Sequence, residues 1–143
     1  MRSLIYSLLF LTLISCNFAE PQNSQTKMIE QKDLTNAQVK DYQFLDCMYQ
    51  DSYFPKFLVD KCKFILLDLC QQIENQKPSH FKDLYQLSHA ATNSINHLED
   101  EFFENDSEIE TAARECLAMD FEFIAKAYGF EADLEELIAT REW

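Results

Sequence analysis

An all-α fold is predicted for residues 36–143, in the form of an antiparallel bundle of about four helices followed by a short C-terminal helix. The whole chain of 143 residues contains only one glycine and three prolines, which leaves long segments of good helix formers uninterrupted. Within these segments apolar residues recur every three or four positions, the spacing of a helix that buries one face. A segment of about 108 residues is also typical of a single domain.

The first two predicted helices cover about residues 36–50 and 55–76. Proline is tolerated in the first turn of a helix, so Pro55 marks where the second helix begins. This helix also carries Phe57, Phe64 and Leu67 away from its main stripe, and we expect it to lie at the centre of the bundle because it is apolar on nearly every side. The main stripes of the two helices are formed by Val39, Tyr42, Leu45 and Tyr49 and by Leu58, Cys62, Ile65, Leu69 and Ile73.

The third helix is expected to begin near Ser79, directly after a proline, and to extend to about Phe102. Ser107 and Glu110 have the spacing of a capping box, which predicts the start of a fourth helix, and Gly129 marks its end. The apolar positions of the third helix are Phe81, Leu84, Leu87, Ala91, Ile95, Leu98 and Phe102.

A last short helix is expected at about residues 132–139, and the indole of Trp143 is expected to pack back on the bundle. The predicted connections are all short. Neighbouring long helices should therefore run antiparallel to one another.

The first fifteen residues have the layout of a bacterial export signal. Arg2 supplies a positive charge, and a largely apolar run of 11 residues follows, which is shorter than the ~20 residues that span a membrane. The run ends in Leu13, Ile14, Ser15 and Cys16, which resemble the lipobox of bacterial lipoproteins. We therefore predict a signal peptide over residues 1–15, recognised through the first three of these residues, with lipid attached to Cys16. A cleaved, secreted form without lipid is the alternative.

The residues that follow the signal are predicted to be a flexible tether. Residues 16–35 comprise the lipidated cysteine and a polar segment with no sustained apolar period, which cannot bury enough surface to become ordered. The protein would then be anchored to a membrane of the bacterial cell envelope through its lipid. Asn17 stands where some inner-membrane lipoproteins carry Asp, which favours the outer membrane, facing the periplasm, in a Gram-negative host.

The chain is strongly acidic, with 25 acidic and 12 basic residues and a net charge of −13. Removal of the signal, and with it Arg2, would make the charge −14. Such a surface repels phosphates, so we expect no nucleic-acid partner. It would attract a basic protein partner. The alternative is that the charge only keeps the domain soluble.

The sequence predicts no metal, cofactor or catalytic site. Glu104, Asp106, Glu108 and Glu110 alternate but lack the glycine-containing loop of an EF-hand, and they fit better as the acidic start of a helix. The histidines, at positions 80, 89 and 97, do not form a zinc-binding pair. No glycine-rich phosphate loop or nucleophile elbow is present. We therefore expect no enzymatic activity.

Asp120 is the one polar residue that falls near the centre of an apolar stripe. An unpaired buried carboxylate is costly, so it should be paired, hydrogen-bonded or protonated with a raised pKa. It could serve as a general acid or base in a cleft, or as a buried polar contact that fixes helix register, and we favour the second interpretation. The candidate partners are Lys61, Tyr42, Tyr49 and Tyr85.

Four cysteines in the predicted domain could form disulfides in an oxidising compartment, and four cysteines allow three complete pairings. Cys62 and Cys70 are eight residues apart on one predicted helix, about 12 Å, which is too far for a bridge. Buried free thiols are an equally good interpretation. The other two cysteines are Cys47 and Cys116.

Five runs of sequence stand out in the predicted domain, namely FLVDK (57–61), HAAT (89–92), SEIETAARE (107–115), DFEFIAKAYGF (120–130) and EELIATREW (135–143). These runs resemble an uncharacterised bacterial family classified as a domain of unknown function, DUF5713. The resemblance implies no activity, because none is assigned to the family. Most members lack an export signal, so this chain departs from the family at its N-terminus.

Two functions from different classes follow from these observations. The first is a membrane-anchored lipoprotein that acts as a protein-binding module, for example an immunity-type protein that neutralises a toxin. The second is a cell-envelope enzyme that uses Asp120. A purely structural lipoprotein is a third alternative.

Overall fold

All regular secondary structure in the described part of the chain is helical. The structure, a computed structural model, describes residues 29–143, and no strand occurs in that range. The predicted signal peptide and the lipid-attachment residue Cys16 lie outside it. The elements in chain order are η1 (Gln31–Asp33), α1 (Ala37–Asp41), α2 (Asp46–Gln50), α3 (Lys56–Gln76), α4 (Phe81–Asn96), α5 (Glu99–Glu104), α6 (Thr111–Ala127) and α7 (Leu134–Leu137).

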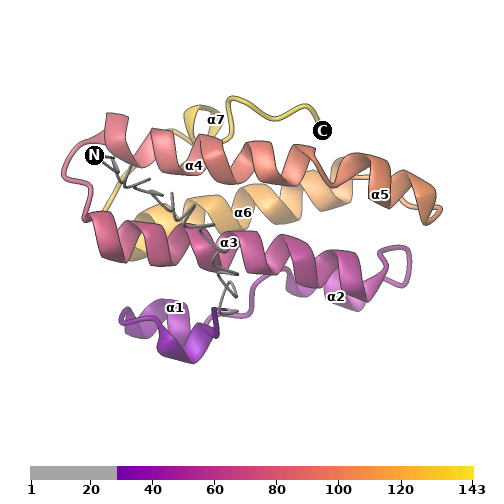
Figure 1. Ribbon diagram of the computed structural model, residues 1–143, viewed down its shortest axis with the longest axis horizontal. Coiled ribbons are helices and arrows are strands. Elements are labelled where there is room, and N and C mark those ends of the chain that lie inside the picture. The colour runs from indigo at the N-terminus through magenta and orange to yellow at the C-terminus, as the bar shows by residue number, and fades with distance from the viewer. Residues whose placement is uncertain (1–28) are drawn as a thin grey trace, which may run out of the picture.

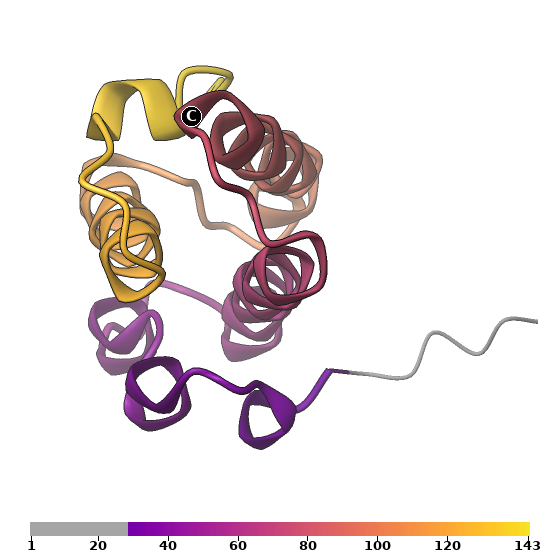
Figure 2. The same cartoon turned by 90° about the vertical axis from the view of Figure 1, so that its left-hand side faces the viewer.

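The helices form an antiparallel bundle with four corners, as predicted. Seen end-on, one corner each is occupied by α3, by α4 with α5, by α6, and by the short helices α1 and α2 (Figure 2). The chain reverses direction between successive corners, and α7 lies across α4 and α6 (Figure 1). The expectation of about four helices and a short C-terminal piece is therefore confirmed, although two of the four corners are built from broken helices.

The core is formed by the facing stripes of these helices. Leu58, Cys62 and Leu66 on α3 are fully buried, as are Ile95 on α4 and Leu117 on α6. Such burial contributes about 1.5–3 kcal/mol for each large apolar side chain. The expectation that α3 is buried on nearly every side was wrong at its start, where the side chain of Phe57 is 48% exposed.

The prediction of one continuous helix over residues 36–50 was also wrong. Asn36 caps α1 as expected, since its side chain accepts hydrogen bonds from the next turn. The helix then ends at Asp41, and the chain is not helical again until α2 begins at Asp46. Between them Phe44 and Leu45 are both buried. An unbroken helix would point adjacent side chains in different directions, so the break lets both enter the core.

The predicted third helix is similarly interrupted. It bends at His97 and Leu98, which divide α4 from α5. The predicted capping box does not form, because α6 begins at Thr111 and its N-cap is Glu110. Ser107 therefore lies in the preceding connection, four residues before the helix.

The end of the fourth predicted helix has the expected glycine. Gly129 has φ +84°, and the amide of Phe130 donates to the carbonyl of Ala125 over 2.9 Å. This is the Schellman arrangement, which satisfies carbonyls at the end of α6 and favours glycine at the left-handed position. Glycine is thus needed here for its conformation.

The ordered domain begins earlier than predicted. Residues 29–35 were assigned to the flexible tether, but Leu34 is only 2% exposed. The side-chain amide of Gln31 donates to the carbonyls of Val39 and Tyr42, each over 2.7 Å. These contacts offset the entropy of ordering a polar segment. At the other end Trp143 is buried, as expected.

None of the helices in residues 29–143 has the length and apolar character that crossing a membrane requires.

Candidate functional site

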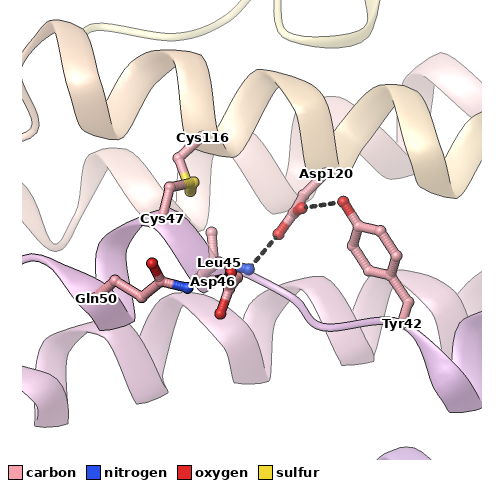
Figure 3. The surroundings of a disulfide bond; sticks show 7 residues. All are labelled: Tyr42, Leu45, Asp46, Cys47, Gln50, Cys116 and Asp120. Atoms are coloured by element: carbon pink, nitrogen blue, oxygen red, sulfur yellow. Dashed lines mark hydrogen bonds between the residues drawn. A yellow bond between two sulfur atoms is a disulfide. The ribbon is translucent and has the colours of Figure 1, made fainter.

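The seam between α2 and α6 contains a buried carboxylate beside a disulfide bond (Figure 3). Asp120 lies on α6 and is 3% exposed. One oxygen of its carboxylate accepts a hydrogen bond from the hydroxyl of Tyr42 and the other from the backbone amide of Leu45, each over 2.8 Å. Both oxygens are therefore occupied by donors from the segment that joins α1 to α2.

That segment has the conformation that brings both donors to the carboxylate. Leu45 has φ +56°, in the left-handed region that residues other than glycine seldom adopt. Tyr42 directly follows α1, and its ring stacks on Phe123 of α6 with ring centroids 3.6 Å apart. The hydrogen bond from Leu45 and the stacked ring of Tyr42 thus hold an otherwise strained connection against α6.

The surroundings of Asp120 change its acidity. Burial raises the pKa of its carboxyl to about 6, although the hydrogen bonds from Tyr42 and Leu45 act in the opposite direction. Burial and the neighbouring carboxylate also raise the pKa of Tyr42. Asp120 lines none of the surface cavities described below, so the arrangement resembles a buried polar contact more than a general acid in a cleft.

The other candidate partners of Asp120 are engaged elsewhere. Lys61 pairs with Glu101 of α5. The hydroxyl of Tyr49 donates to Asp60 over 2.6 Å. The hydroxyl of Tyr85 accepts from the amide of Asp133 over 3.3 Å. Of the four side chains considered, only Tyr42 reaches the carboxylate, because the broken first helix turns it toward α6.

The disulfide joins Cys47 of α2 to Cys116 of α6, one helical turn before Asp120. Their Cα atoms are 6.2 Å apart, within the range that a disulfide spans. Cys47 is an exposed residue, whereas Cys116 is buried. The bond and the two hydrogen bonds of Asp120 thus fasten the same seam.

The remaining candidate cysteines are free thiols inside the core. Cys62 and Cys70 are both fully buried on α3, and neither takes part in a disulfide bond. Burial raises the pKa of each thiol to about 12, which disfavours the reactive thiolate. They serve as small apolar side chains.

The histidines and carboxylates do not gather into a metal site in the described residues. Within residues 29–143 no group of three or more His, Cys, Asp or Glu side chains is placed to hold an ion. His89 Nε2 instead donates to the carbonyl of Glu136 over 2.6 Å, which links α4 to α7. His80 and His97 flank the two ends of α4 and are exposed.

Sequence reasoning missed a second polar cluster, centred on Glu74 near the end of α3. Its carboxylate accepts hydrogen bonds from the amides of Thr35 and Asn36 and from the hydroxyl of Tyr128, all within 3.0 Å. Burial opposes its ionisation, but the hydrogen bonds together lower the pKa of this carboxyl. Glu74 therefore holds the start of the domain against α3 and α6. No helix-wheel signal could identify it, because two of its donors are backbone amides.

Surface cavities of about 250–420 Å³ accompany these clusters in residues 29–143. The largest of these is a groove between α3 and α4, lined by apolar residues such as Phe64 and Leu87 and by polar residues such as Asp68 and Gln72. Glu74 and Tyr128 line another, of about 400 Å³. A third, of about 330 Å³, lies at the end of the bundle and is lined in part by Tyr53 and Phe103.

Comparison with known proteins identifies a family but no function. Residues 38–143 match the sequence model described as "Family of unknown function (DUF5713)". No curated protein and no solved structure matches the chain.

Proposed function

The chain belongs to the DUF5713 family of proteins of unknown function, and we propose that it is a bacterial lipoprotein whose helical domain binds another protein at the cell envelope. In this proposal residues 1–15 direct export, and a lipid on Cys16 anchors the chain to the membrane. The segment that joins Cys16 to residue 29 serves as the tether.

The disulfide between Cys47 and Cys116 is the observation that carries the export part of the proposal. Disulfides persist in the periplasm and other oxidising spaces and are rare where glutathione and thioredoxin keep thiols reduced. Cys47 is exposed, so reductants would have access to the bond in a cytosol. A structural disulfide in the domain agrees with an export signal before it, and the lipobox-like residues 13–16 give that signal its lipoprotein character.

The binding part is supported by the surface of the domain. The chain has a net charge of −13, and several large apolar side chains nonetheless face solvent. Tyr53, Phe57 and Phe103 are 40%, 48% and 72% exposed. Exposed aromatic rings are enriched at protein interfaces. An immunity-type role, in which the acidic domain neutralises a basic toxin by binding it, is the specific form of this proposal.

The enzymatic alternative rests on one observation, the raised pKa of Asp120. Against it, both carboxylate oxygens already accept hydrogen bonds from the protein, and a general base must reach its substrate. A purely structural lipoprotein would use the same anchor but require no specific partner. We therefore rank protein binding first.

Cell fractionation of the Cys16→Ala variant tests the anchor. The wild-type chain should be recovered with membranes, in the outer-membrane fraction for a Gram-negative host. The variant should become soluble with an unchanged circular dichroism spectrum. Cys62→Ser, which alters a core thiol, is the matched control and should stay with the membranes. An anchor on Cys16 is ruled out if the Ala variant remains bound.

Affinity capture from envelope extracts tests the binding function. The chain, purified from its host, should recover one partner in a stoichiometric amount, and recovery should fall at high salt because screening weakens charge attraction. Recovery of no stoichiometric partner would favour the purely structural alternative.

A further inference from the structure

A hollow at one end of the bundle combines exposed aromatic rings with acidic side chains. Tyr53 comes from the connection between α2 and α3, and Phe103 lies near the end of α5. The rest of the lining comes from the connection between α5 and α6, namely Asp106, Ser107 and Glu108. Figure 1 shows that both connections lie at the same end of the molecule. The hollow is open to solvent and has a volume of about 330 Å³, enough for a large side chain.

One polar group in this hollow lacks a partner. Ser107 is 1% exposed, and its hydroxyl makes no hydrogen bond within residues 29–143. A buried hydroxyl without a partner costs about 1–3 kcal/mol, so such groups are rare. Rotation of this side chain would turn the hydroxyl toward a polar ligand group in the hollow and supply the missing hydrogen bond.

The two charged residues that line the hollow, Asp106 and Glu108, are both acidic. Seven of the twelve residues 99–110 are acidic and none is basic. Lys61, the nearby cation, pairs with Glu101 and lies 6.0 Å from the centroid of the Phe57 ring. Neither Asp106 nor Glu108 forms an ion pair with another described residue. Their carboxylates are thus available to a cation from outside.

We propose that this hollow binds an arginine side chain presented by a basic protein partner, which deepens and rests on the proposed protein-binding function. The guanidinium would lie against the rings of Tyr53 and Phe103, a favourable cation–π arrangement. Its five donors would reach the carboxylates of Asp106 and Glu108, which line the hollow. Lysine fits less well because its compact charge has fewer donors and stacks poorly.

The acidic charge also argues against three other possible occupants of the hollow, namely a second copy of this chain, an anionic membrane surface and a phosphate. A second copy of this chain would place one acidic end near another acidic protein, and like charges repel. An anionic membrane surface or a phosphate would be repelled for the same reason. A basic protein is attracted, and its association would be accelerated by the same field.

Titration with a capped peptide, Ala-Arg-Leu-Arg-Ala, tests the site directly. The chain, isotope-labelled and purified from its host, is followed by NMR of its backbone amides. Saturable shifts should map to residues 53, 103 and 106–108. The same peptide with citrulline in place of arginine keeps the shape but not the charge, and its affinity should be at least tenfold weaker.

Matched variants locate the binding to this end of the bundle. Phe103→Ala and the pair Asp106→Asn with Glu108→Gln should each weaken binding of the arginine peptide at least fivefold. Phe81→Ala, which removes an equally apolar and 47% exposed ring at the start of α4, should leave the affinity unchanged. The proposal is overturned if the shifts map elsewhere, if citrulline binds equally well, or if the hollow variants bind as the wild type does.

Affinity capture distinguishes the proposed arginine site from the broader proposal that the domain binds a protein. Where affinity capture recovers a partner, Phe103→Ala should reduce recovery and Phe81→Ala should not. Equal recovery with both variants would leave the protein-binding function standing and refute the hollow as its site. Where no partner is recovered, the peptide titration alone decides whether the hollow is an arginine site.

Discussion

The carboxylate of Asp120 accepts a hydrogen bond over 2.8 Å from the backbone amide of Leu45, although the two residues are 75 positions apart. Leu45 directly precedes α2 and has a left-handed conformation, and one helical turn before Asp120 a disulfide joins α2 to α6. The seam between these helices is therefore held by a hydrogen bond and a covalent bond that reinforce each other.

Removing the disulfide should lower stability substantially. The bond closes a loop with a sequence separation of 69, and loop-closure entropy gives about 4 kcal/mol for such a loop. Cys47→Ser with Cys116→Ser should lower the free energy of unfolding in guanidinium by about 2–5 kcal/mol. Wild type treated with reductant should behave like the double variant. Equal stability with and without reductant would show that the bond is absent in solution.

Replacing Asp120 should change how stability depends on pH. The pKa of this carboxyl rises from 3.8 to about 6 in the folded state, so the folded state holds the proton more tightly than the unfolded one. Wild type should therefore lose stability as pH rises from about 4 to about 6, by at most about 3 kcal/mol. Asp120→Asn, which keeps the shape, should lack this loss.

The comparison uses the difference between wild type and variant at each pH, because other carboxyls titrate in the same range. Glu115→Gln, an exposed change on the same helix, is the control and should follow wild type. A difference between wild type and Asp120→Asn that stays constant from pH 4 to pH 7 would contradict the raised pKa.

Replacing Glu74 should loosen the start of the domain. Glu74→Ala leaves the amides of Thr35 and Asn36 and the hydroxyl of Tyr128 without their acceptor, which should cost about 1–3 kcal/mol. Amide hydrogen exchange should become faster over residues 31–41 and change little in α4. Glu104→Ala, at an exposed position, should leave the exchange unchanged.

Glu74 should also have the opposite pH dependence to Asp120. Its pKa is lowered in the folded state, so its contribution to stability is present above its ordinary pKa of 4.5 and is lost as pH falls below that value. Glu74→Gln should reduce the loss of stability in acid. A variant that loses stability in acid as steeply as wild type would count against the lowered pKa.

Gly129 offers a test of backbone conformation without a change in packing. Its φ is +84°, and a Cβ built there meets no atom within 4 Å. Gly129→Ala should therefore cost only the conformational term, about 1 kcal/mol, and lower the melting temperature by about 4 °C. Gly129→Asn should cost less, since Asn tolerates the left-handed region better than Ala. Equal melting temperatures for all three chains would contradict the strain.

The long helices could be predicted because the patterns that mark them involve residues only a few positions apart in the chain. The stripe from Leu58 to Ile73 and the proline at 55 predicted α3, and the observed helix is Lys56–Gln76. Gly129 likewise marked the end of α6. Helical periodicity and capping depend on residues a few positions apart, so they can be read along the chain.

The candidate site could be predicted only in part. Asp120 was identified as a polar residue in an apolar stripe, but its amide donor, Leu45, could not be. That donor is a backbone amide, and it lacks a partner within a helix only because the first helix breaks. The break itself depends on contacts with α6. The apolar spacing around Tyr42 and Leu45 was equally compatible with the continuous helix that we expected.

The sequence by itself determined the helical class, the positions of the long helices and the acidic charge, because each depends on composition or on near neighbours. Only the tertiary structure decided that Cys47 pairs with Cys116, that Tyr42 is the side chain that reaches Asp120, and that residues 29–35 join the domain. These outcomes depend on which segments meet across the bundle. A contact between residues 69 or 75 positions apart leaves no periodic trace in the chain, since it is selected by the packing of whole helices.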